Sequence, residues 1–201
     1  MKIQGLKNLN ITLLFSTPLN HLLISKDDVV NLFKTGDAQK DLFSLVEASG
    51  LKVVIFPNQK KDVVFENSRV ILSDKSEVVI DQSTIVADLR KILNANFVDQ
   101  SKIIAYGFNY DFLVELDNGT DLIGTKISQL PGITITNTGV NLSFEKNELT
   151  HVLNISSTGK KKLFLVHFNS HFNSTSIPED AVLHEQIITQ FKESKELLIN
   201  L

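Results

Sequence analysis

The chain has 201 residues, 42% of them hydrophobic and 21% charged, a balance typical of chains that fold around one core. The formal net charge is -3 and the only arginines are Arg69 and Arg90, so we expect no nucleic-acid partner. Because the chain contains no cysteine, disulfides, thiolate metal sites and cysteine nucleophiles are excluded.

The sequence shows neither a membrane-spanning segment nor a secretory signal. Its first apolar run, residues 11–15, is far shorter than the ~20 residues that a spanning helix needs, and Asn8 and Asn10 precede it. We therefore expect a cytoplasmic protein without a membrane partner.

The N-terminal part of the chain predicts one strand followed by two short helices. Residues 9–19 have the composition of a strand. Ser25 and the acidic residues after it are typical of a helix start, and Gly36 would end that helix. Residues 42–48 predict a second short helix that ends at Gly50.

From residue 51 onward the apolar period becomes that of strands. Four short strands separated by turn residues are expected at residues 53–56, 63–66, 69–73 and 77–80. Asp81 or Ser83 would then cap a helix that runs to Phe97. Its apolar stripe contains Ile85, Leu89, Ile92 and Phe97, while Asp88, Arg90 and Lys91 lie off the stripe.

The most diagnostic segment is residues 103–116, in which apolar and polar side chains alternate. One face carries Ile104, Tyr106, Phe108, Tyr110, Phe112, Val114 and Leu116. The other carries Gly107, Asn109, Asp111 and Glu115. One buried face and one wetter face are the habit of antiparallel sheets, so a doubly wound parallel fold is disfavoured.

The rest of the chain predicts more strands and a final helix. Strands are expected at residues 132–136, 140–145, 149–155 and 161–172, and a helix of about five turns extends to Leu198 after a capping box at residues 176–179. The fold class is therefore α+β, an extensive antiparallel sheet with helices packed on one face. Residues 1–100 and 101–201 run through similar elements, which suggests one domain made of two similar meander-plus-helix halves.

The candidate catalytic residues are Asp111, His167, His171 and His184. In a strand His167 and His171 would stand about 13 Å apart, too far to share a metal ion, so we expect no metal site. His184 would have to meet His171 across the fold to form an acid–base group with Asp111 or Glu115.

Residues 119–126 resemble a phosphate-binding loop, but their Lys and Thr stand in reversed order and Pro131 prevents a long helix after them. We therefore expect a loop there, and no nucleotide or other cofactor.

One resemblance to a known family can be drawn. It rests on the order of elements: residues 52–56 and 70–73, then a helix, then Ile103-Ile104-Ala105-Tyr106-Gly107-Phe108-Asn109-Tyr110. This order resembles that of a sporadically distributed family of uncharacterised bacterial proteins. The strand 163–169 and the helix with Leu183-His184-Glu185 and Phe191 add to the likeness. The chain lacks that family's Arg in the strand and has no Trp. The resemblance implies an α+β fold of unknown function, and it assigns no catalytic residues to this chain.

The sequence leaves three functions open. The first is a non-enzymatic protein-binding or assembly protein that engages a partner, or its own copy, through sheet edges or an apolar face. The second is a carrier of a small apolar ligand, in a cavity between a curved sheet and the C-terminal helix near Tyr106, Tyr110 and Phe168. The third is a hydrolase-type enzyme that uses the Asp and His groups named above.

Overall fold

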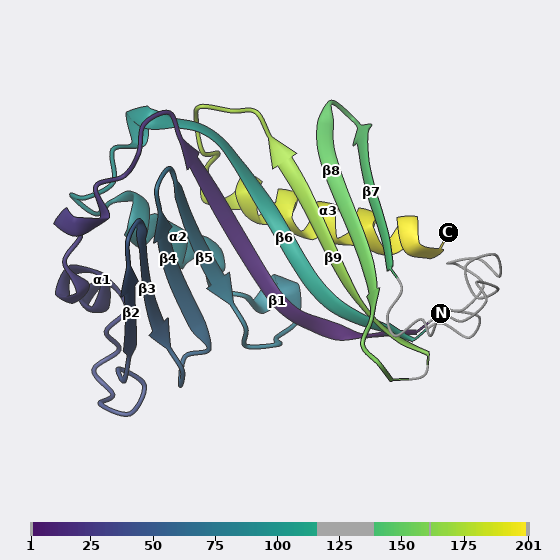
Figure 1. Ribbon diagram of the computed structural model, residues 1–201, viewed down its shortest axis with the longest axis horizontal. Helices are drawn as coiled ribbons and strands as arrows, with labels where there is room; N and C mark the ends of the chain where they lie inside the picture. Colours follow the sequence, from purple (N-terminus) through teal and green to yellow (C-terminus); the bar gives the residue numbers. More distant parts are fainter. Residues whose placement is uncertain (1, 116–138, 161, 200–201) are drawn as a thin grey trace, which may run out of the picture.

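A nine-stranded antiparallel sheet with three α-helices dominates the computed structural model, which describes residues 2–115, 139–160 and 162–199 (Figure 1). The predicted α+β class is confirmed. The strands are β1 (Lys2–Phe15), β2 (Ser44–Ala48), β3 (Leu51–Phe56), β4 (Lys61–Glu66), β5 (Arg69–Asp74), β6 (Ile103–Glu115), β7 (Gly139–Lys146), β8 (Leu149–Ser157) and β9 (Leu163–Phe172). The α-helices are α1 (Lys26–Leu32), α2 (Ile85–Leu93) and α3 (Asp180–Ile199), and short 3-10 turns occur at His21–Leu23, Ile80–Gln82 and Gln100–Lys102.

The strand order across the sheet is β2-β3-β4-β5-β1-β6-β9-β8-β7. In each half of the chain the first strand pairs with the last strand of the meander, β1 with β5 and β6 with β9. The two first strands then pair with each other, antiparallel, in the middle of the sheet. The halves 1–100 and 101–201 share this pairing, although the first has five strands and the second four in the described residues, and their similarity as repeated halves stays a prediction.

The three α-helices pack against the same face of the sheet (Figure 1). The side chains that point towards them alternate along each strand, and in β6 they are Tyr106, Phe108, Tyr110, Phe112 and Val114, all 2% exposed or less. The predicted strand is confirmed over its described residues, and its aromatic face from Tyr106 onward is buried as expected. Ile104, expected on the same face, is instead 48% exposed, because the pairing of β1 with β6 shifts register between Leu14 and Phe15. This face is the core of the protein.

The predictions for two elements are wrong. Residues 44–48 form strand β2 rather than part of a helix, because Ser49 and Gly50 make the turn of a hairpin with β3 and Gly50 has a φ of 76°. Residues 77–79 are irregular and Ile80 begins a 3-10 turn, since Glu77 has a φ of 60°, which breaks an extended strand. The following helix is also shorter than expected and runs from Ile85 to Leu93.

The expected strand 132–136 and the loop 119–126 lie outside the described residues. No helix in the described part of the chain is long and apolar enough to cross a membrane.

Candidate functional site

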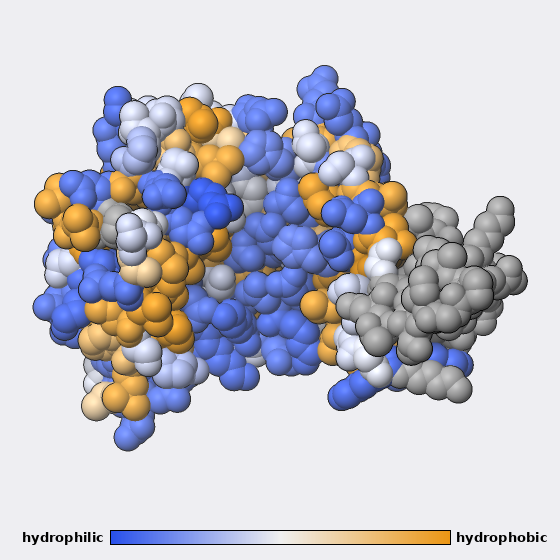
Figure 2. Space-filling view, viewed as in Figure 1, coloured by the Kyte–Doolittle hydropathy of each residue, from blue (hydrophilic) through white to orange (hydrophobic). Residues whose placement is uncertain are grey.

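The face of the sheet opposite α1, α2 and α3 carries no helix among the described residues, and we call it the uncovered face. Figure 2 looks onto it: hydrophilic residues gather along the middle, over β1, β6 and β9, and hydrophobic residues lie to either side. The pairing of the nine strands aligns one side chain from each strand in a row across this face, and the row runs from Ser44 on β2 to Ser143 on β7.

The polar middle contains a ladder of asparagines. Asn10, Asn109 and Asn169 stand side by side on β1, β6 and β9. Asn169 Nδ2 donates to Asn109 Oδ1 at 2.7 Å, and Asn109 Nδ2 donates to Asn10 Oδ1 at 2.6 Å. Because each amide both donates and accepts, the three side chains bind one another across the strands and hold the middle of the sheet in register.

Next to this ladder, Asp111 and His167 face each other across β6 and β9. Nδ1 of His167 lies 2.6 Å from Oδ1 of Asp111, and Asn8 Nδ2 donates to Oδ2 of Asp111 at 2.8 Å. Partial burial raises the pKa of Asp111, but the hydrogen bonds from His167 and Asn8 outweigh it, so the pKa lies below its ordinary value. Asp111 is therefore a carboxylate at neutral pH.

The structure thus brings two of the four candidate catalytic residues into contact. The carboxylate orients the imidazole, and proton exchange through such a pair is possible in principle. Catalysis also needs a reacting group and a cavity that excludes water. The His167 side chain is 41% exposed on the uncovered face, so the pair is open to solvent in the part of the chain that the structure describes.

The other two candidates are not part of this pair. His171 lies on the uncovered face, and its Nε2 is 2.9 Å from Oδ1 of Asn173. His184 lies on α3, on the opposite side of the sheet. The sheet therefore separates His171 from His184, and no acid–base group joins them.

The three aromatic residues considered for a ligand cavity lie in the core between the sheet and α3. The Tyr110 hydroxyl donates to the Ile187 carbonyl at 2.8 Å, and the Tyr106 hydroxyl donates to Gln186 Oε1 at 3.0 Å. The Tyr110 ring lies 6.3 Å from that of Phe168. Tyr106 is 2% exposed, and Tyr110 and Phe168 are fully buried, so their rings fill the space that a ligand would need.

The apolar side of the uncovered face lies over β2 to β5. Val46, Val53, Val64 and Ile71 stand in register on these four strands, and we call them the valine row. Val46 is 49% exposed and the other three are partly exposed. A row of β-branched side chains is flat and stiff, which suits contact with another surface.

Ion pairs border the valine row on both sides. Lys75 pairs with Asp62 on one side, and Arg69 pairs with Glu66 on the other. Each pair is neutral as a whole, so the rim has polar groups without a dominant charge. An apolar centre with a polar rim is the usual anatomy of a protein–protein contact.

Sequence reasoning did not identify a buried polar network on the helix-covered side. Ser170 Oγ lies 3.1 Å from His151 Nδ1 and donates to Gln190 Oε1 at 2.8 Å. His151 and Ser170 are at most 1% exposed, and burial lowers the pKa of His151. The alternation of side chains along the strand places Ser170 on the same inward face as Phe168 and Phe172. This alternation is the sequence signal from which the burial of Ser170 could have been predicted. Complete burial gives this network a structural role, joining β8 and β9 to α3.

In the described residues no group of three or more His, Asp or Glu side chains is arranged to hold a metal ion. Neither a family model nor a curated protein sequence matches the chain. The resemblance to a bacterial family therefore stays an expectation.

Proposed function

We propose that this chain is an assembly protein that pairs with a second copy of itself through the uncovered face, with the valine row at the centre of the contact. The observation that carries the proposal is the row itself: four apolar side chains in register, with no helix over them in the described chain. Removing such surface from water favours association by roughly 25 cal/mol per Å² of apolar area.

The chemistry of the patch favours a copy of the same chain as the partner. In a two-fold contact the same patch meets itself, so a flat row of similar β-branched side chains is complementary to its own copy. The neutral ion pairs at its rim, Asp62–Lys75 and Glu66–Arg69, present no excess of one charge that would repel a second copy or select a strongly charged partner.

The face is a better contact than the edges of the sheet. At one edge, β2 has only five residues. At the other, β7 carries Glu145 and Lys146, and charged residues on an edge strand oppose pairing with another chain. The contact that we propose therefore packs sheet against sheet rather than extending the sheet.

The test measures molar mass by size-exclusion chromatography with light scattering over a range of concentrations. We expect the wild-type chain to be dimeric at high concentration and Val64→Lys to weaken dimerisation at least tenfold, because a lysine there would lie in the apolar centre. Val64→Thr keeps the branched shape and should weaken it less.

The matched control is Val182→Lys, because Val182 is 48% exposed on α3, on the other side of the molecule. This variant should dimerise like the wild type, and the melting temperature of each variant shows whether it is folded. A wild-type chain that stays monomeric at every concentration, or a folded Val64→Lys variant that dimerises unchanged, contradicts the proposal.

A further inference from the structure

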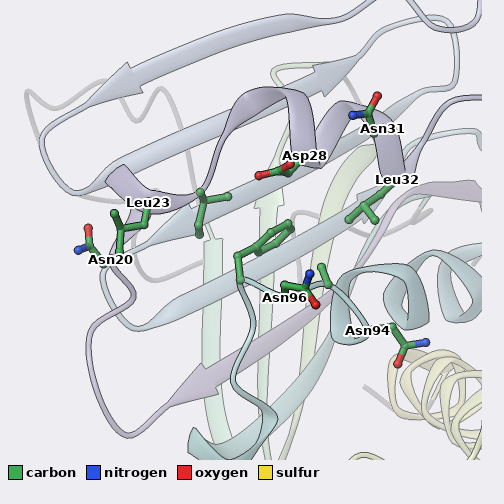
Figure 3. A pocket seen from close by; sticks show the side chains of 10 residues that line it. Asn20, Leu23, Asp28, Asn31, Leu32, Asn94 and Asn96 are labelled. Carbon is green, nitrogen blue, oxygen red and sulfur yellow. The ribbon is translucent and has the colours of Figure 1, made fainter.

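A cleft of about 740 Å³ opens on the helix-covered side of the molecule, between the segment that leads into α1 and the end of α2 (Figure 3). Its volume is within the range of about 300 to 1,000 Å³ typical of small-molecule sites. Asn20, Leu23, Asp28 and Leu32 line one wall, and Asn96 and Phe97 line the other. The cleft is separate from the uncovered face, so it does not depend on the proposed dimer.

Both walls are fixed by contacts beneath them. On one side Val29 and Phe33 are buried in the core, and the Nζ of Lys52 donates to the carbonyl of Ile24. On the other side the loop after α2 is held by backbone bonds, with Ala95 N donating to Ile92 O and Val98 N to Ala95 O at 3.1 Å each. The cleft is therefore largely pre-formed, which reduces the entropy that a ligand must lose on binding.

The lining combines amides with apolar surface. Five of its ten residues are Asn or Asp, namely Asn20, Asp28, Asn31, Asn94 and Asn96. Their side chains make no hydrogen bond to another residue of the described ranges, so their donors and acceptors remain available to a ligand. Phe97, Leu32 and Leu23 contribute apolar surface next to them.

This chemistry selects the class of ligand. None of the ten lining residues is Lys, Arg or His, and Asp28 is the one charged group, so phosphates and carboxylates are disfavoured. Figure 3 shows the side chains of Asn31 and Asn94 pointing away from the space between the two walls, so Asn20 and Asn96 are the amides left to meet a ligand. An amide both donates and accepts, which matches a ligand dense in hydroxyl groups, and the ring of Phe97 offers a surface for the C–H face of a sugar ring. An entirely apolar ligand would leave these polar groups without partners.

We propose that the cleft binds a neutral, polyhydroxylated ligand such as a short oligosaccharide. The probes are maltose, cellobiose, lactose and N,N′-diacetylchitobiose, each titrated into the full chain and followed by saturation-transfer NMR. We expect saturable binding of at least one of them.

Two variants from opposite walls, Asn20→Ala and Asn96→Ala, should each weaken that binding at least tenfold. The matched control is Asn141→Ala, an exposed asparagine on β7 outside the cleft, which should leave binding unchanged. Thermal melting establishes that every variant is folded. Absence of saturable binding for all four sugars, or binding that survives both cleft variants, overturns the proposal.

Discussion

At the scale of single residues, Asp88 is the least exposed carboxylate in the described part of the chain. It lies on α2, is 1% exposed, and pairs with Lys61 on β4 and with Lys91 one turn along the helix. Thr84 Oγ1 donates to it at 2.9 Å. Burial raises the pKa of Asp88, but the hydrogen bonds from the two lysines and Thr84 outweigh it and leave the pKa below its ordinary value.

We expect Asp88→Asn to lower the free energy of unfolding at pH 7 by about 2 to 3 kcal/mol, the typical loss for hydrogen bonds to a charged group. Because the folded-state pKa is depressed, the contribution of Asp88 is complete above its unfolded value of about 4 and disappears as the pH falls through the folded value. Urea unfolding at several pH values should therefore show the difference between wild type and variant shrinking below pH ~4.

The control is Asp81→Asn, which removes the same charge from an exposed residue and should change stability by no more than about 0.5 kcal/mol. A difference between wild type and Asp88→Asn that is absent at pH 7, or that grows as the pH falls, would refute this account of the buried carboxylate.

Asp88 also shows where residue-level prediction from the sequence stops. Its position, three residues after Ile85 and four before Ile92, lies next to the apolar stripe of α2. Whether a carboxylate there is solvated or buried depends on Lys61, which comes from a distant strand. The pair Asp111 and His167 is similar: alternation predicts that both are on polar faces, but only the pairing of β6 with β9 makes them neighbours.

At the scale of elements, the helix that closes the core is α3. Its buried residues Leu183, Ile187, Phe191 and Leu198 follow helical spacing, so the element and its apolar side could be predicted from sequence. Residues 42–48 could not, because a short apolar run fits either a helix or a strand until its partner β3 is known. The order of the strands in the whole sheet depends on such pairings between strands.

Phe191 is the central contact of α3 with the sheet. Its ring stacks on Tyr110 with 5.4 Å between centroids and meets Phe112 edge-on at 5.6 Å. We expect Phe191→Ala to destabilise the fold by about 3 to 5 kcal/mol through the lost burial and the cavity that it leaves. Both tyrosines of the chain, Tyr106 and Tyr110, hydrogen-bond to α3, so near-ultraviolet circular dichroism of tyrosine reports its docking.

Lys192→Ala serves as the control, because Lys192 follows Phe191 on the helix and is exposed. The tyrosine circular dichroism and the stability of this variant should match those of the wild type. If Phe191→Ala left both properties unchanged, α3 would not be held in the way that the structure indicates.

At the scale of the whole molecule, the sheet is organised around its centre. β1 and β6 each pair on both sides, and together they join the N-terminal meander to the C-terminal one. The sequence indicated two similar halves from the order of their elements alone. The central pairing of their first strands was not predictable, because it links residues about 100 positions apart without any local signal.

This arrangement predicts how the backbone opens and how two copies meet. Amide hydrogen exchange should be slowest in β1 and β6 and fastest in the edge strands β2 and β7, because a central strand opens only when the ladders on both sides break.

The same measurement at low and high protein concentration tests how two copies meet. If copies pack through the valine row, dimerisation buries side chains but leaves the outer edges of β2 and β7 unchanged. The amides of β2 and β7 should then exchange at the same rate at both concentrations. Protection that appears at alternate amides of β2 or β7 on dimerisation would instead mean that the sheet is extended at an edge, and the contact would have to be moved from the face to that strand.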